Sequence, residues 1–315
     1  KGDYITAPNI SILFSEIIAI WIVLFWKELK SPSKFNLVEL GSGNGEMILQ
    51  ICKTLEKFPF IQKSCSISIF EKSSYLKKIQ KKKLKKYKIR WLNHLTDLPN
   101  FPTIFIANEF FDALPIKQFI KKKNKWYERN IKYSKSSKAK ILDLLTTVKK
   151  LETKVGFKIS SGQKFIEFSP LSLKYLKYIS KSIKLNNGGL LIIDYGYLDK
   201  QMKNTLKSIS KHKFNDVLEN FGKSDISHDL NFKLIEKIVN MLGLKVNGIT
   251  SQKYFLEKLG ILERAELISK DVPFSEKANI YFRLKKLIDI NEMCHLFKVM
   301  FITKKNMNFK TGFQN

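Results

Sequence analysis

The sequence has few of the residues on which disulfide frameworks and metal sites depend. Its 315 residues include three cysteines, Cys52, Cys65 and Cys294, none of which belongs to a Cys-x-x-Cys pair. An odd number of cysteines is a poor disulfide framework, so we expect a reducing compartment. The four histidines show neither an HExxH motif nor a paired spacing. The sequence therefore predicts no metal site.

Arginine is also scarce, although the chain is strongly basic. Only four of its 57 basic residues are arginine, and with 28 acidic residues the formal net charge is +29. Recognition of phosphates and bases favours the planar guanidinium group over the lysine ammonium. A coding bias toward A and T would account for the joint abundance of Lys, Ile, Asn and Phe. The excess of lysine therefore gives little support to a nucleic-acid partner.

The sequence lacks an apolar run long enough to cross a bilayer. The longest, at residues 10–26, is interrupted by Ser11, Ser15 and Glu16, so that only ten residues from Ile17 to Trp26 are continuously apolar. A bilayer core needs about 20. The run also lacks the basic start and small-residue cleavage site of a signal peptide. We expect a buried helix here and no transmembrane segment.

What the sequence does contain is an alternation of apolar strands and amphipathic helices. Its patterns predict strands at 35–40, 66–71, 103–107 and 189–194, and helices at 47–55, 75–87 and 172–183. Such alternation is typical of an α/β fold with a parallel, doubly wound, Rossmann-like sheet.

Other stretches do not fit this alternation. Residues 117–133 read as a polar hairpin turning at 122–125, placed where it could cover a cleft. Later patterns predict helices at 231–242 and 274–288, a strand-to-helix passage at 246–259 and a strand at 295–302. We expect a single domain, with a core at about 1–115 and 165–200 plus the strand at 295–302. Insertions forming a helical and strand cap would occupy about 116–164 and 201–290.

The strongest local signal is a glycine-rich turn between the first strand and its helix. Residues 39–45 read Glu-Leu-Gly-Ser-Gly-Asn-Gly, and Glu46 stands where dinucleotide-binding folds place their third glycine. This spacing favours S-adenosyl-methionine over NAD, since the bare backbone can approach the methionine part of the cofactor. Glu71, at the end of the next strand, can accept both ribose hydroxyl hydrogens. The alternative is an ordinary strand-helix turn.

A second signal follows the strand at 103–107. The loop from Asn108 to Pro115 carries Glu109 and Asp112, and a helical turn would place both carboxylates on one face, able to hold a guanidinium group. Phe110 and Phe111 would then wall the pocket. Alignment and a nearby carboxylate are what methyl transfer to nitrogen requires. Alternatively, Asp112 caps the next segment and Glu109 is solvated.

With these motifs, the sequence resembles the MidA family of class I methyltransferases, whose mitochondrial members assist assembly of respiratory complex I. The resemblance is collinear across nearly the whole chain. Its motifs are residues 2–8 (GDYITAP), 38–45 (VELGSGNG), 108–115 (NEFFDALP), 126–129 (WYER) and 194–197 (DYGY), with shorter matches near Ser251, Arg264 and 296–299.

The resemblance implies a class I methyltransferase sheet, the cofactor S-adenosyl-L-methionine, and methylation of arginine in a complex I subunit. It also places Gly2, Asp3, Thr6 and Pro8 in a loop near the cofactor, where the alternative is a simple helix entry at Asn9 or Ser11. The expected catalytic residues are Glu109 and Asp112. The expected cofactor-binding residues are Gly2, Asp3, Thr6, Pro8, Glu39, Gly41, Ser42, Gly43, Gly45, Glu71 and Asn108.

The sequence departs from the family at two places. Asn9 replaces an acidic residue, and residues 225–232 read DISHDLNF where the family has a DITAHVDF-like stretch, so that Asp229 and Asn231 stand at its His and second Asp. The altered stretch at 225–232 leaves open an assembly factor that binds the cofactor without catalysis. The positive charge of the chain leaves open an RNA methyltransferase as a further alternative. No transit peptide is visible, and the chain starts at Lys1 rather than Met. We therefore expect upstream residues to be missing and favour the bacterial cytoplasm over the mitochondrial matrix.

Overall fold

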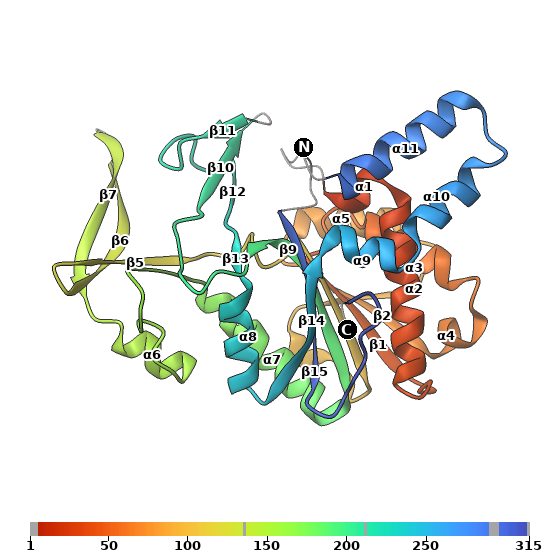
Figure 1. The fold of residues 1–315 in the computed structure, drawn as a ribbon, viewed down its shortest axis with the longest axis horizontal. Coiled ribbons are helices and arrows are strands. Elements are labelled where there is room, and N and C mark those ends of the chain that lie inside the picture. The colour runs from red at the N-terminus through yellow and green to blue at the C-terminus, as the bar shows by residue number, and fades with distance from the viewer. Residues whose placement is uncertain (1–5, 135–136, 211–212, 290–295, 314–315) are drawn as a thin grey trace.

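The apolar strands come together in one eight-stranded sheet (Figure 1). A computed structural model describes residues 6–134, 137–210, 213–289 and 296–313, and the sheet is that of these residues. Its order is β14-β15-β9-β4-β1-β2-β3, with the short β13 beside β9. The pairs among β1, β2, β3, β4 and β9 are parallel, whereas β15 runs antiparallel to both β9 and β14. The strands are β1 (Phe35–Leu40), β2 (Cys65–Phe70), β3 (Ile89–Leu92), β4 (Thr103–Asn108), β9 (Gly188–Tyr197), β13 (Leu230–Asn231), β14 (Leu244–Ser251) and β15 (Phe297–Lys304).

Helices cover both faces of this sheet, as the predicted α/β fold requires (Figure 1). Side chains alternate across each strand: Phe35 and Leu37 of β1 join the core beneath α2 and α3, while Val38 and Leu40 join the core beneath α7 and α8. The α/β prediction is confirmed. The helices are α1 (Ala7–Ile10), α2 (Ile12–Glu28), α3 (Glu46–Leu55), α4 (Pro59–Ser64), α5 (Ser74–Lys83), α6 (Lys149–Val155), α7 (Pro170–Asn186), α8 (Phe232–Met241), α9 (Gln252–Lys258), α10 (Ile261–Ser269) and α11 (Phe274–Ile288), with a 3-10 turn η1 (Leu95–Asp97).

The apolar run near the start of the chain is the buried helix α2, as predicted. Trp21 is fully buried and packs edge-on against Phe301 of β15, with ring centroids 4.8 Å apart. Its indole Nε1 donates to the Thr311 carbonyl oxygen over 3.2 Å, a contact between residues 290 positions apart. Among the described residues, no helix combines the length and the apolar character that crossing a membrane requires.

The inserted hairpin is present, but it belongs to a larger sheet than expected. β5 (Lys117–Lys122) and β6 (Lys125–Ser134) form the predicted pair, while β7 (Ser137–Thr146) and β8 (Phe165–Phe168) extend it to four strands. A second small sheet comprises β10 (Lys207–Ser210), β11 (Lys213–Asn215) and β12 (Asp225–Ser227). Figure 1 shows the β6–β7 hairpin and this small sheet projecting to the same side of the molecule. The Tyr133 and Phe221 rings, 5.6 Å apart, join the two projections.

One part of the stretch expected to be a cap lies in the main sheet instead. β13 and β14 fall within 201–290, yet they pair with β9 and β15 respectively. β14 pairs antiparallel with β15 and so extends the main sheet by one strand at that edge. We propose that the insertions comprise the two small sheets and the segments around them, and that β13 and β14 belong to the core.

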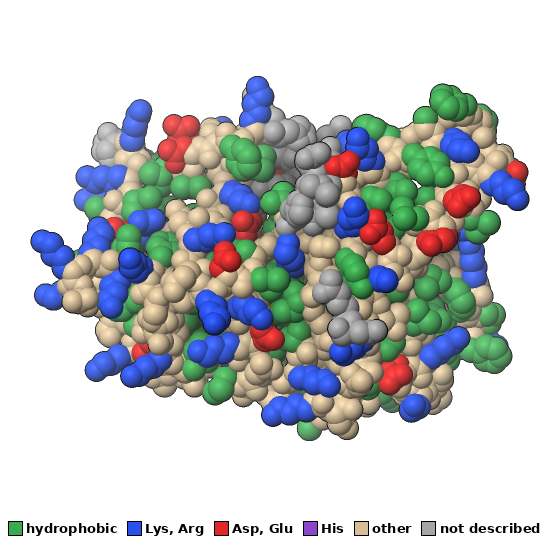
Figure 2. Space-filling model, in the orientation of Figure 1, with side chains coloured by type: hydrophobic (Ala, Val, Ile, Leu, Met, Phe, Trp, Pro, Cys, Tyr) green, Lys and Arg blue, Asp and Glu red, His purple; other side chains and the backbone are tan. Residues whose placement is uncertain are grey.

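Lysines cover the surface without gathering into one stripe on the visible face. Figure 2 shows lysine and arginine side chains scattered over most elements of that face, with acidic side chains between them. Scattered lysines are what a composition bias produces, and a solvated charge contributes little to stability.

Candidate active site

The glycine-rich turn connects β1 to α3 with three residues in the left-handed region. Gly41, Gly43 and Gly45 have φ angles of +68°, +51° and +79°, which side chains disfavour. At Gly41 a Cβ atom would also lie 2.7 Å from the Phe110 ring. Gly45 is the N-cap of α3, so the turn ends where the helix begins. The backbone of this turn therefore carries no side chains at its three glycines, and its conformation is one that other residues disfavour.

A cavity of about 300 Å³ opens beside this turn. It lies at the carboxyl end of the parallel strands, where doubly wound sheets bind their ligands. The expected residues found along it are Thr6, Pro8, Glu39, Gly41, Ser42, Gly43, Asn108 and Glu109, joined by Asn9, Asn44, Glu46, Met47 and Leu76. Gly45, Glu71 and Asp112 are not among the lining residues. Gly2 and Asp3 lie outside the described residues.

Glu39 presents a buried carboxyl group to the cavity from the end of β1. Its Oε2 accepts a hydrogen bond of 2.6 Å from the Ser42 hydroxyl, which holds the turn against the strand. Burial, with a smaller contribution from the negative charge of Glu71, raises the pKa of Glu39 to about 7. Such a group can accept hydrogen bonds from ligand hydroxyls, so Glu39 suits a ribose at least as well as Glu71 does.

Glu71 lies behind the glycine turn rather than along the cavity. Its Oε1 accepts from the Ser73 amide over 2.8 Å, and its Oε2 accepts from Gln80 Nε2 over 3.4 Å. The same Gln80 nitrogen donates to the Gly43 carbonyl oxygen over 2.8 Å. Glu71 and Gln80 thus brace the turn, and contact between Glu71 and a ribose stays a prediction.

The loop after β4 is not the helical turn that the spacing predicted. Glu109 adopts a left-handed φ of +49°, and its amide donates to the Ile193 carbonyl oxygen of β9 over 2.9 Å. The positive φ of Glu109 turns the chain sharply after β4, so a shared helical face is not available. The Glu109 carboxyl instead lines the cavity, where it accepts from the Ala7 amide at 3.4 Å and the Asn108 side chain at 3.3 Å.

Phe110 and Phe111 anchor this loop in the core instead of walling the cavity. The Phe110 ring lies beneath Gly41 and 6.4 Å from the Phe70 ring, and Phe111 is fully buried. The two rings therefore do not wall the pocket as expected. They support the loop instead, because they fix its distance from the sheet. Asn108, at the end of β4, is buried with its Oδ1 unpartnered at the cavity, ready to accept a hydrogen bond.

Asp194, which was not among the expected site residues, holds the loop from within β9, directly after the part of β9 that pairs with β4. Its Oδ2 accepts from the amides of Phe111 and Asp112, at 3.0 and 3.3 Å, and it is completely buried. The signal that could have found it is its place at a strand end in the DYGY motif, opposite the loop of the neighbouring strand.

Three buried carboxyl groups therefore crowd together at this edge. Burial, together with the charge of Asp112, raises the pKa of Glu109 to about 8. Burial also raises the pKa of Asp112 to about 7, and burial with the nearby Asp112 and Glu109 holds the pKa of Asp194 well above its ordinary value. Carboxyl groups held in this state favour any cation that can reach them.

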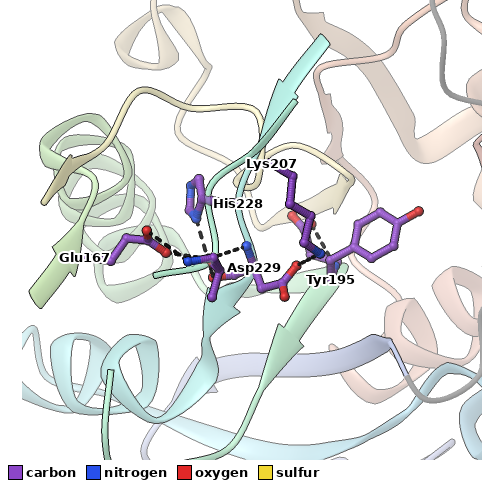
Figure 3. Close-up of polar contacts among 7 residues, drawn as sticks. Glu167, Tyr195, Lys207, His228 and Asp229 are labelled. Carbon is purple, nitrogen blue, oxygen red and sulfur yellow. Dashed lines mark hydrogen bonds and ion pairs between the residues drawn. The ribbon is translucent and has the colours of Figure 1, made fainter. Parts of the chain in front are cut away.

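The stretch that departs from the family pattern contacts this cluster through Asp112, and Figure 3 shows its residues His228 and Asp229 beside Glu167 and Lys207. The His228 amide donates to the Asp112 carbonyl oxygen over 3.1 Å, and Asp229 forms a 2.5 Å ion pair with Lys207 of β10. Asp229 is further fixed because its amide donates to the Thr205 hydroxyl, which donates in turn to Glu167 of β8. Burial lowers the pKa of His228, whose Nε2 has no partner. Within the described ranges, no group of three or more His, Cys, Asp or Glu side chains is placed to hold a metal ion.

Comparisons with known proteins agree with this geometry. A model of a family described as S-adenosyl-L-methionine-dependent methyltransferases matches residues 17–250. The chain is 27% identical over 322 residues to the mitochondrial protein arginine methyltransferase NDUFAF7 of Xenopus tropicalis, covering 94% of this chain and 74% of that one. It is 28% identical over 305 residues to the Drosophila melanogaster homologue, covering 88% and 69%.

Solved structures show the same fold. A Burkholderia thailandensis protein crystallised with S-adenosyl-homocysteine has a TM-score of 0.78 at 21% identity, covering 99% of this chain and 80% of that one. The native structure from the same organism has a TM-score of 0.80 at 21% identity, covering 99% and 84%. Because the family model spans well over half of the chain, the chain belongs to the MidA family of S-adenosyl-L-methionine-dependent methyltransferases.

Proposed function

We propose that this methyltransferase transfers the methyl group of S-adenosyl-L-methionine to an arginine side chain of a protein, and that the protein is a subunit of respiratory complex I. The observation that carries the proposal is the cluster of Glu109, Asp112 and Asp194 beside the cavity. Buried acids favour a cationic acceptor such as guanidinium. The relatives' name, protein arginine methyltransferase, supports the same acceptor.

The cavity of about 300 Å³ fits the cofactor, because Gly41 and Gly43 line it without side chains and a Cβ atom at Gly43 would meet no atom within 4 Å. Glu39, Ser42 and Asn108 would hold it through hydrogen bonds, with the glycine backbone at close approach. When bound, the cofactor supplies a methyl group on a positively charged sulfur. The remaining requirements, orientation of the acceptor nitrogen and removal of its proton, fall to the side chains of this chain.

We assign proton removal to Glu109, which lines the cavity, and orientation of the guanidinium to Asp112. Attack on a methyl group needs a nitrogen lone pair, and a guanidinium group gains one as it loses a proton. A carboxyl group whose pKa is raised to about 8 is a stronger base than an ordinary carboxylate once it is ionised. Activity should therefore increase as the pH rises toward and past about 8.

The test is transfer of a labelled methyl group to purified complex I subunits by the full-length protein. We expect label on arginine, and Glu109→Gln should lower the rate by about 100-fold or more while binding of S-adenosyl-homocysteine changes little. Because the amide has nearly the same shape as the carboxylate, we expect the Glu109→Gln protein to fold. Its binding of S-adenosyl-homocysteine checks that it does. Absence of label on every subunit, with the cofactor bound, would refute the proposed substrate.

The altered stretch around Asp229 favours a second candidate, an assembly factor that binds the cofactor and stabilises its client without methylating it. The ion pair of Asp229 with Lys207 neutralises one acid near the site. If Glu109→Gln and Asp112→Asn variants support complex assembly as well as the parent, this candidate replaces catalysis. In either case we propose a location where complex I is assembled, the mitochondrial matrix or the bacterial cytoplasm; the curated relatives are named as mitochondrial.

A further inference from the structure

A partly exposed cation lies close to the acids beside the cavity. The Lys207 ammonium is 2.5 Å from Asp229 Oδ1 and 5.7 Å from the centre of the Tyr195 ring (Figure 3). A carboxylate on one side and an aromatic face on the other are the surroundings that bind a guanidinium or ammonium group. The chain itself thus provides a cation at a place suited to a cationic ligand.

This place is continuous with the acids assigned to catalysis. The His228 amide bonds to the Asp112 carbonyl oxygen, so Asp229 follows directly after the residue that touches the catalytic loop. Tyr195 follows Asp194, whose carboxylate holds the amides of Phe111 and Asp112. The residues around Lys207 therefore come from the same strand end and loop as the catalytic acids.

An unpartnered acceptor also points to a missing ligand here. Asp112 is 7% exposed, and its Oδ1 has no hydrogen-bond partner among the described residues. A buried carboxylate oxygen without a donor is costly, unless a ligand supplies the donor during function. A guanidinium group has five N–H donors and can satisfy two carboxylates at once.

We propose that Asp229 and Tyr195 complete the binding site for the acceptor arginine, and that the Lys207 ammonium occupies this site until the substrate displaces it. The inference rests on the proposed function. The Lys207 and Asp229 side chains retain 30% and 24% of their exposure, so an incoming side chain can reach both. Lys207 lies on β10 of the small projecting sheet, so it can leave with that strand or by rotating its own flexible side chain.

Because Lys207 occupies the site, only ligands that compete successfully with its ammonium group would bind. A ligand must bind more strongly than the resident ammonium, which a planar guanidinium can do through paired hydrogen bonds and an ordinary lysine cannot. The apparent affinity of the substrate is then reduced by the fraction of molecules in which Lys207 is in place. Removing this cation should strengthen substrate binding, whereas removing a supporting ion pair should weaken it.

The experiment measures binding of N-acetyl-arginine amide by calorimetry to full-length protein saturated with S-adenosyl-homocysteine. We expect Lys207→Met to bind this probe about tenfold more tightly than the parent, since the closed form no longer competes. Lys207→Arg should bind it no better than the parent. Asp229→Asn, introduced into the Lys207→Met protein, should weaken binding by about tenfold or more.

Two controls separate this effect from general electrostatics. Lys213→Met removes the same charge from exposed β11 and should leave the affinity within about twofold of the parent. N-acetyl-citrulline amide, which is neutral, should bind no better to Lys207→Met than to the parent. Unfolding curves of all variants test whether each is folded.

The results that would overturn this inference differ from the result that would refute the proposed function. Unchanged or weaker binding of the arginine probe to folded Lys207→Met overturns this inference, as does equal tightening by Lys213→Met or absence of binding to every variant. Failure of the parent to bind S-adenosyl-homocysteine would instead refute the proposed function.

Discussion

The cofactor side and the acceptor side of the cavity are built in different ways. The cofactor side is mainly one continuous stretch, residues 39–46, in which a strand end, a bare turn and a helix start follow each other, with Thr6, Pro8 and Asn108 added from elsewhere. The acceptor side is assembled entirely from separate segments, with Glu109 and Asp112 after β4, Asp194 within β9, and Asp229 before β13. The first is fixed by local backbone geometry, and the second depends on tertiary packing. A change to one side should therefore leave the other largely intact.

The largest effect should come from Gly41→Ala. The new methyl group would lie 2.7 Å from the Phe110 ring at a φ of +68°, so both the turn and the loop beneath it must move. We expect binding of S-adenosyl-homocysteine, measured by calorimetry, to weaken by about 100-fold or more.

The matched control is Gly162→Ala, which has a φ of +71° but nothing within 4 Å of the added atom. It should cost about 1 kcal/mol of stability through backbone strain and leave cofactor binding unchanged. Equal losses of affinity in the two variants would show that strain, rather than the approach of Gly41 to Phe110, explains the result.

A change confined to the acceptor side is Asp194→Asn. The amide nitrogen cannot accept from backbone N–H groups, so at least one of the bonds to Phe111, Asp112 or Tyr195 must break. Methyl transfer should fall by about 30-fold in kcat/KM, while the affinity for S-adenosyl-homocysteine changes by less than about threefold. A parallel loss of cofactor binding would mean that the two sides are one cooperative unit.

The smallest effect should be a pH dependence of stability without ligand. Glu39, Glu109 and Asp112 have folded-state pKa values raised to about 7, 8 and 7, above their ordinary values of 4.5, 4.5 and 3.8. The folded state therefore binds more protons than the unfolded state between these limits, so stability falls as the pH rises from about 4.5 to about 8 and levels off above that.

The unfolding temperature should thus decrease over this window by a few degrees, at about 2–4 °C for each kcal/mol. Glu109→Gln should flatten the part of the curve near pH 8, because its amide does not titrate. A melting temperature that rises from neutral to mildly alkaline pH would contradict the burial of these acids.

The sequence predicted well what is encoded locally. The turn at 39–45, the main parallel strands and the buried helix α2 follow from glycine spacing and apolar periodicity. The cavity residues Thr6 and Pro8 came only from the resemblance to the family, since no periodicity marks them. Glu109 lines the cavity, but its left-handed backbone could not be predicted because the spacing of two acids carries no information about φ.

What could not be predicted depends on distant partners. Asp194 reads as an ordinary strand end until β9 is placed beside β4. β7 was missed because its apolar and charged residues, such as Ile141, Asp143 and Leu144, do not alternate regularly. The ion pair of Lys207 with Asp229 joins two separate stretches of the chain. These stretches lie together only because β10 pairs with β12 in the small sheet.

The hydrogen bond from Trp21 to Thr311 has a consequence for how the protein is made. During synthesis α2 leaves the ribosome well before Phe301, against which Trp21 packs, and before its acceptor at Thr311, 290 positions further along the chain. The Trp21 indole therefore lacks both partners while the residues between them are translated. This part of the core is completed only when residues near 311 have emerged, and until then its apolar surface is exposed to aggregation.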